Sequence, residues 1–157
     1  MVIRAVIDTS SLVPSTKRRT LQELAQQGLY VAVWSPWIVA ELNRVLAWYW
    51  LRTVRPDDLS LASERACSSA AHRMMEILFA TFTLVHPEPP YPPAWPTLRD
   101  VWDLPIWAAA KLTNARCVVS ENTRDFPPID DTGRHMYEGI EYLTVDAFIA
   151  LLTGDVE

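Results

Sequence analysis

The 157-residue sequence is poor in cysteine, histidine and glycine, with two, three and four of each. Cys67 and Cys117 stand far apart without a neighbouring cysteine, so they form no zinc-binding pattern, and a disulfide is not expected in a reducing cytosol. We expect both to be small apolar core residues. The scattered histidines give little support to a histidine metal site or a Cys-His nucleophile.

Positive charge is also scarce, because 14 lysines and arginines face 19 aspartates and glutamates, for a formal net charge of −5. This balance argues against broad, nonspecific binding of nucleic acid through a basic surface. It does not exclude a nuclease, because an acidic metal site itself contributes negative charge. No apolar run reaches the roughly 18 residues of a membrane-spanning helix. The N-terminal MVIRAVIDTSS lacks a signal-peptide layout, so we expect a cytoplasmic protein without membrane contact.

Half of the residues are hydrophobic and 21% are charged, which is typical of a globular chain. The length fits a single domain over residues 1–157. Seven tryptophans are many for this length, and we expect them in helix packing or at a partner surface. Trp37, Trp48 and Trp50 are candidates for a partner contact, with core packing expected for at least one of them.

Short apolar runs alternate with segments of helical spacing along the chain. The runs predict strands at 2–7, 29–34, 81–85, 116–120 and 140–145. The helical segments are expected near 21–27, 36–52, 56–78, 103–114 and 147–152. This alternation predicts an α/β fold, a three-layer α/β/α sandwich with a mainly parallel central sheet.

Residues that commonly begin or end helices set the expected helix boundaries. Ser35 and Pro36 predict a helix start, Gly28 a helix stop, and Asp146 the cap of the closing helix. Six prolines between residues 86 and 96 predict an extended loop, and 121–139 is also expected to be a loop.

Several carboxylates fall at predicted strand ends, where function gathers in parallel sheets. Asp8 ends the first strand, where a lone buried carboxylate is costly, so it either caps the following turn or pairs with a cation. Glu41 lies beside the apolar face of its helix and could instead form an ion pair with Arg44. Asp103 precedes Leu104-Pro105 as a candidate N-cap, with Asp100 three residues earlier on the same turn.

Asn122 and Asp125 follow the strand that ends near Ser120, and either could simply hydrogen-bond within its loop. The joint placement of these side chains is more informative than any one of them. Magnesium and manganese prefer oxygen ligands. A site of three or four converging carboxylates or amides could therefore bind one or two ions and hydrolyse a phosphodiester.

Four segments carry a resemblance that spans nearly the whole chain: VIDTSSLV, SPWIVAELNRVL, DLPIWAAAKLTNARCVVSENTRDFP and IEYLTVDAFIALL. They resemble the PIN-domain family, the fold of many prokaryotic toxin ribonucleases of the VapC type. The third segment is the most specific, with an acidic start of an Ala-rich helix, a strand and Asn-x-x-Asp-Phe. The sequence departs from the family in having Asn122 where many relatives have aspartate, and Asn114 in place of a glycine.

The resemblance implies catalytic and metal-binding roles for Asp8, Glu41 and Asp103, with Mg²⁺ or Mn²⁺ as the cofactor. The resemblance places Asn122 at the fourth ligand position of the metal site, directly or through water. The supporting polar groups are Ser10, Ser120 and Asp125, together with the neighbouring Asp100.

The implied activity is a metal-dependent endoribonuclease, either the toxin of a type II toxin–antitoxin pair or an RNA-processing enzyme. Homodimerisation and a cognate antitoxin are the expected protein partners of a toxin. Lys17, Arg18 and Arg19 form the only compact basic run, which either contacts RNA phosphates or is a solvated helix entry.

Two other readings compete with a nuclease. A PIN-like module that binds RNA or protein but cleaves poorly is kept open by Asn122. A phosphatase or response-regulator-like domain also begins with a strand-end aspartate. That class would need a suitably placed lysine and an Asp-x-Asp motif, which Asp8-Thr9-Ser10 does not provide.

Overall fold

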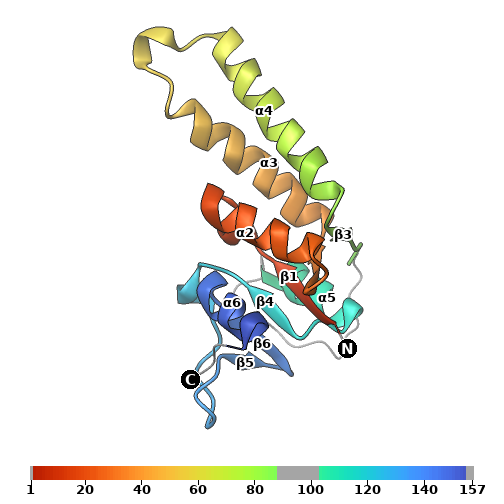
Figure 1. The fold of residues 1–157 in the computed structure, drawn as a ribbon. Helices are drawn as coiled ribbons and strands as arrows, with labels where there is room; N and C mark the ends of the chain where they lie inside the picture. The colour runs from red at the N-terminus through yellow and green to blue at the C-terminus, as the bar shows by residue number, and fades with distance from the viewer. Residues whose placement is uncertain (1, 88–102, 155–157) are drawn as a thin grey trace.

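A six-stranded sheet forms the centre of the protein in the computed structural model, which describes residues 2–87 and 103–154 (Figure 1). The strand order is β3-β2-β1-β4-β6-β5. All neighbouring strands are parallel except β5, which runs antiparallel to β6. The strands are β1 (Ile3–Ile7), β2 (Tyr30–Trp34), β3 (Thr83–Leu84), β4 (Cys117–Val119), β5 (Met136–Tyr137) and β6 (Ile140–Leu143).

Helices flank this sheet, as the predicted three-layer sandwich requires. They are α1 (Thr9–Leu12), α2 (Ser15–Gln26), α3 (Pro36–Leu51), α4 (Leu61–Phe79), α5 (Leu104–Thr113) and α6 (Val145–Thr153). α5 packs on β1, β2 and β4, whereas α2 contacts β2 and α6 contacts β6. α3 and α4 pack against each other as a hairpin that extends away from the sheet (Figure 1). The fold class is therefore confirmed.

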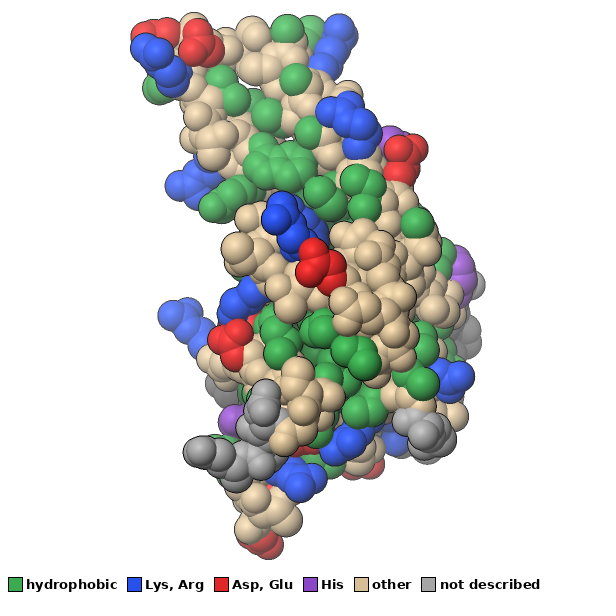
Figure 2. All heavy atoms as spheres, in the orientation of Figure 1, with side chains coloured by type: hydrophobic (Ala, Val, Ile, Leu, Met, Phe, Trp, Pro, Cys, Tyr) green, Lys and Arg blue, Asp and Glu red, His purple; other side chains and the backbone are tan. Residues whose placement is uncertain are grey.

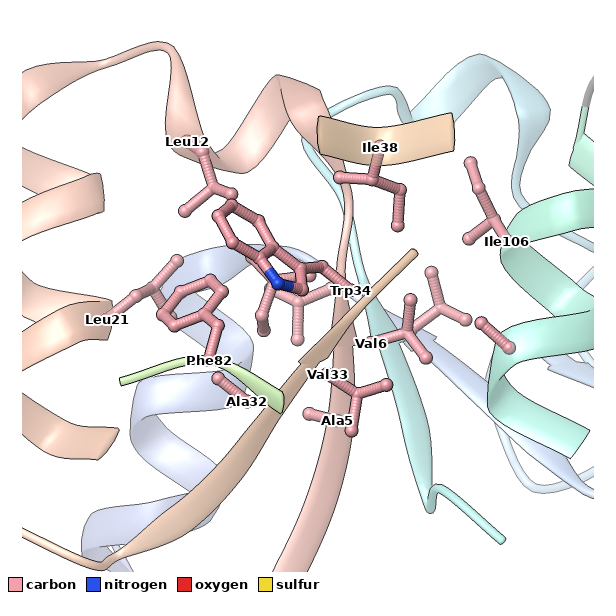
Figure 3. Close-up of a cluster of buried hydrophobic side chains, with 14 of the residues drawn as sticks. Ala5, Val6, Leu12, Leu21, Ala32, Val33, Trp34, Ile38, Phe82 and Ile106 are labelled. Atoms are coloured by element: carbon pink, nitrogen blue, oxygen red, sulfur yellow. The ribbon is translucent and has the colours of Figure 1, made fainter. Parts of the chain in front are cut away.

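The core lies where the central strands meet the flanking helices. Leu12 and Leu21 lie on the Trp34 side of β2, and Ile106 of α5 lies on the Val6 side (Figure 3). The Trp34 ring also packs edge-on against Phe79 and Phe82 of the α4–β3 region, at centroid distances of 4.7 and 5.2 Å.

Only one of the two cysteines belongs to this core. Cys117 on β4 is fully buried, as predicted, but Cys67 on α4 is only partly buried and lies outside the core. The prediction for Cys67 was wrong because that part of α4 belongs to the hairpin with α3, which projects away from the sheet.

Helix boundaries follow local capping chemistry. Ser35 Oγ accepts a hydrogen bond from the Ile38 backbone N–H at 3.4 Å, with Pro36 in the first turn, as predicted. Gly28, at φ +74°, follows the end of α2 as the predicted stop. The predicted Asp146 cap is wrong. The hydroxyl of Thr144 accepts instead from the Ala147 N–H at 3.3 Å, so α6 begins earlier.

Short elements were missed where the sequence predicted turns and loops. The helix expected near 21–27 begins at Ser15, and α1 precedes it. The expected start of the fourth helix at Pro56 is a separate 3₁₀ turn, η1 (Pro56–Asp58), and the Ser60–Ser63 capping box starts α4 itself. The expected loop 121–139 contains η3 (Thr123–Asp125) and β5. Of the proline-rich stretch, residues 88–96 lie outside the described residues.

On the face drawn in Figure 2, positive and negative side chains are scattered rather than gathered in one continuous track. On the face in Figure 2, hydrophobic side chains gather over the α3–α4 hairpin and again over the α2–α6 region. Trp48 and Tyr49 on α3 are about half exposed, at 56% and 51%. Within the described ranges no helix has the length and apolar character to cross a membrane.

Truncation of Phe148 on α6 tests the core assignment. This fully buried ring packs edge-on against Tyr30 at a centroid distance of 4.9 Å. Phe148→Ala should lower the free energy of unfolding by about 3–5 kcal/mol in urea titrations, through lost burial and the cavity left behind. Ile129→Ala, at a side chain 62% exposed, is the control and should cost less than about 0.5 kcal/mol. Equal losses would contradict the assignment.

Candidate functional site

Several of the polar residues predicted for the site lie between β1 and β4. At this point in the sheet the chain connections run in opposite directions. β1 and β4 are adjacent and parallel, with Ile7 opposite Val119. The chain leaves β1 toward β2 on one side and leaves β4 toward β6 on the other. A crevice forms at such a switch point, outside the carboxyl ends of the strands. Asp8 and Ser120 are the first residues beyond these two ends.

Asp8 is held by hydroxyl groups rather than by a helix terminus. Its side chain is 9% exposed, and Oδ2 accepts hydrogen bonds from Ser10 Oγ at 2.7 Å and from Ser120 Oγ at 2.9 Å. Although Asp8 occupies the N-cap position of α1, its carboxylate makes no capping hydrogen bond. The turn-capping alternative therefore does not describe this residue, and one carboxylate oxygen is oriented by donors from both strand ends.

The same two serines also order the loop that follows β4. The backbone N–H of Glu121 donates to Ser10 Oγ at 2.9 Å, and that of Asn122 donates to Ser120 Oγ at 3.1 Å. The two hydroxyl oxygens are 3.0 Å apart. Ser10 and Ser120, which were predicted as supporting polar groups, thus connect Asp8 to the loop that carries Asn122 through one hydrogen-bond network.

Glu41 lies beside this network without lining the cavity next to Asp8. Its Oε2 accepts a hydrogen bond from Thr9 Oγ1 at 2.6 Å, which links α3 to the residue after Asp8. The described structure contains no Glu41–Arg44 ion pair, so that alternative is not what holds the side chain. Thr9 was not singled out from the sequence, because a Thr between Asp8 and Ser10 reads equally well as turn chemistry.

A small cavity of about 30 Å³ marks the centre of the crevice. This volume accommodates an ion or one or two waters, not a nucleobase. Asp103 opens α5 but its carboxylate makes no N-cap hydrogen bond. Asn122 Nδ2 donates to Asp125 Oδ2, which joins two of the lining residues. The lining residues are Asp8, Asp103, Ile106, Val118, Ser120, Asn122, Asp125, Phe126 and Tyr142, and Asp100 lies outside the described residues.

The three residues of the predicted basic run have different environments. Lys17 Nζ donates to Glu121 Oε2 at 2.7 Å and lies 3.9 Å from Asp146. Arg18 is buried and donates to the carbonyl oxygens of Leu12 and Val13, so it stabilises the α1–α2 turn. Of the three residues predicted to contact RNA, Arg19 is the one whose side chain is exposed.

Glu121 is a positioning residue that the sequence did not reveal. Besides Lys17, its carboxylate accepts a hydrogen bond from the Val145 backbone N–H at 2.9 Å, at the start of α6. Partial burial opposes ionisation of Glu121, but the Lys17 and Val145 hydrogen bonds and the Lys17 charge outweigh it, so its pKa is lowered. The hydrogen bond to Glu121 is in turn the main reason that the pKa of Lys17 is raised. This pair ties the β4 loop to α2 and α6.

Tyr142 on β6 is the second residue that was missed. It pairs with Val118 across the sheet and lines the cavity beside Asp8 and Asp103. Burial raises the pKa of its phenol, and the charges of Asp103 and Asp8 raise it further, so the hydroxyl stays protonated at neutral pH. Only the period-two alternation of IEYL hinted at its orientation, because the β4–β6 register cannot be read from the sequence.

The donor chemistry of the crevice fits a hard divalent cation. Three aspartates, an amide and a hydroxyl line the cavity, and Mg²⁺ and Mn²⁺ prefer oxygen ligands. Over the described ranges, no three His, Cys, Asp or Glu side chains are grouped closely enough to hold a metal by themselves. Mg²⁺ keeps several waters and commonly uses one or two carboxylates plus substrate phosphates, so a partly water-mediated site fits these residues.

Comparisons with known proteins assign no chemistry to this site. No protein-family model matches the sequence, and no curated protein matches it significantly. Among solved structures, the chain is similar to the crystal structure of PAE2754 from Pyrobaculum aerophilum. That likeness has a TM-score of 0.49 at 13% sequence identity, over 97% of this chain and 90% of the other.

Glu121→Gln tests the link between the β4 loop and its two helices. The amide keeps an acceptor for Val145 but loses the charge that attracts Lys17, so we expect a loss of about 0.5–1 kcal/mol of unfolding free energy at pH 7. Because the folded-state pKa of Glu121 is lowered, its contribution is present above the ordinary carboxyl pKa and disappears as pH falls through the lowered value. In urea titrations the variant should therefore be less stable than the wild type at pH 7, and the two should become equally stable once the pH is below the lowered pKa of Glu121. A difference that persists in acid would contradict the ion-pair account.

Proposed function

We propose that the crevice at the carboxyl ends of β1 and β4 is the active site of a divalent-metal-dependent endoribonuclease. The observation that supports this function is the convergence of Asp8, Asp103 and Asp125 on one small cavity. These residues come from three separate segments of the chain. A capping or loop role for each residue alone does not account for their meeting at the switch point of the sheet.

The charge of the cavity favours a positive partner. Three carboxylates would repel one another and would repel a phosphate. Mg²⁺ or Mn²⁺, when bound, supplies Lewis-acid stabilisation of the phosphate charge and activates a water for attack. Both alternative metals prefer the oxygen donors that these side chains offer.

The protein groups have separable tasks in this proposal. Asp8 and Asp103 hold the cation, with Asp125 and Asn122 completing the site directly or through water. Ser10 and Ser120 fix one oxygen of Asp8, since both hydroxyls donate to Oδ2, which leaves Oδ1 for the cation.

Glu41 has a different relation to the cavity. The Thr9 hydrogen bond holds its carboxylate next to the segment that carries Asp8, outside the cavity lining. In this proposal Glu41 would add a further carboxylate beside the residues that would hold the cation.

The biological setting of the activity is proposed from the sequence resemblance. A type II toxin would have a cognate antitoxin and would form a homodimer, whereas an RNA-processing enzyme need not have an antitoxin. The half-exposed Trp48 and Tyr49 on α3 offer apolar surface for a protein partner. A neighbouring reading frame that encodes a small DNA-binding protein would favour the toxin role.

A PIN-like module that binds RNA or protein without efficient cleavage is the second candidate. The observation that favours it is that the described carboxylates do not form a ready group of three metal ligands. Asn122 in place of an acid would further weaken the metal site. Mn²⁺ or RNA binding without turnover by folded protein would support this candidate.

Substitution of the two central aspartates tests the nuclease proposal. Asp8→Asn and Asp103→Asn should each lower the rate of RNA cleavage in Mg²⁺ or Mn²⁺ on the order of 100-fold, because each removes charge that holds the cation. Cleavage of a mixed RNA pool is followed on gels, and EDTA should abolish it in the wild type.

Asp57→Asn is the matched control, because Asp57 is an exposed aspartate in η1 at the tip of the α3–α4 hairpin. It should cut RNA at the wild-type rate. Cleavage that continues in EDTA, or that survives both cavity substitutions, would rule out the proposed site.

A further inference from the structure

We infer that Tyr142 contacts the substrate, with its phenolic hydroxyl donating a hydrogen bond to a phosphate oxygen of RNA in the crevice. This inference rests on the proposed ribonuclease function and adds a residue to the site.

The other polar donors that line the cavity have partners within it. Ser120 Oγ donates its only hydrogen to Asp8 Oδ2 at 2.9 Å, and one N–H of the Asn122 amide donates to Asp125. Asp8, Asp103 and Asp125 are acceptors when ionised. Within residues 2–87 and 103–154, the Tyr142 hydroxyl has no hydrogen-bond partner, although Tyr142 lines the same cavity. A donor therefore remains available for a ligand that enters.

The Tyr142 ring is held in place before any ligand binds. Its backbone N–H donates to the His135 carbonyl at 2.8 Å, and its ring meets Phe126 edge-on at a centroid distance of 5.9 Å. Phe126 in turn packs against the His135 ring at 5.2 Å. The His135 Nδ1 lies 2.6 Å from the Pro127 carbonyl oxygen, which orients that ring. A hydroxyl on a fixed ring loses little conformational freedom when it binds.

A neutral donor suits an anionic ligand at an acidic cavity. A lysine at this position would form ion pairs with Asp8 or Asp103 and would compete with a cation for them. A protonated phenol leaves the charges of the carboxylates available and still attracts a phosphate oxygen. Hydrogen bonds to charged acceptors are also the stronger kind.

Tyr142→Phe provides the test, because it keeps the ring that packs on Phe126 and removes only the hydroxyl. With a short single-stranded RNA and saturating Mn²⁺, kcat/KM should fall about 10- to 100-fold. The affinity for a phosphorothioate-substituted RNA, measured by fluorescence anisotropy, should fall with it. The affinity for Mn²⁺ alone, measured by titration calorimetry, should stay within about twofold of wild type.

Tyr137→Phe is the matched control on the neighbouring strand. The Tyr137 ring packs against Trp107 at a centroid distance of 6.1 Å and does not line the cavity. Tyr137→Phe also removes one hydroxyl, but it should leave the cleavage rate and the RNA affinity within about twofold of wild type.

The outcomes separate this inference from the proposed function. Wild-type cleavage with unchanged kcat/KM and RNA affinity in Tyr142→Phe would overturn the role of Tyr142 and leave the nuclease standing. Mn²⁺ affinity that falls in parallel with activity would also overturn it, because the hydroxyl would then act on the metal site. A folded, metal-loaded wild type that neither cuts nor binds RNA would overturn both.

Discussion

Two serine hydroxyls that share one oxygen of Asp8 are the interaction on which the crevice depends. A nearly buried carboxylate is costly without partners, and Ser10 and Ser120 supply them from the ends of two adjacent strands. The same hydroxyls accept hydrogen bonds from the backbone beyond β4. The position of the acidic side chain and the path of the loop are thus mutually dependent. Loss of either hydroxyl would disturb both.

The second constraint is electrostatic. The crevice concentrates carboxylates, and the partly buried Lys17 forms an ion pair with Glu121 beside it. Under the proposed function, attraction of the anionic substrate would therefore come from a bound cation and from neutral donors rather than from basic side chains. This balance agrees with the net charge of −5, which argues against general binding of nucleic acid through a basic surface. Any selectivity would then arise locally at the crevice.

The fold was predictable from the sequence because its larger elements have strong periodic signals. The apolar runs that became β1 and β2 and the Ser35-Pro36 start of α3 needed no tertiary information. The grouping of Asp8, Asp103 and Asp125 was predictable only in part, since strand ends place residues at one edge but do not set distances. Tyr142 and Glu121 were not predictable, because their roles depend on the β4–β6 register and on the approach of α2 and α6. The α6 cap was misassigned because Thr144 and Asp146 are both good capping residues only two positions apart.

The projecting α3–α4 hairpin has a practical consequence for handling the protein. α3 has 16 residues, so its far end lies roughly 24 Å along the helix axis from its start near the sheet. The connection at that end includes the exposed turn η1, which packs against neither the sheet nor the crevice. Exposed turns of this kind tolerate inserted sequence. A fluorophore or an affinity tag placed there would report on the molecule, or immobilise it, while leaving the entrance to the crevice open.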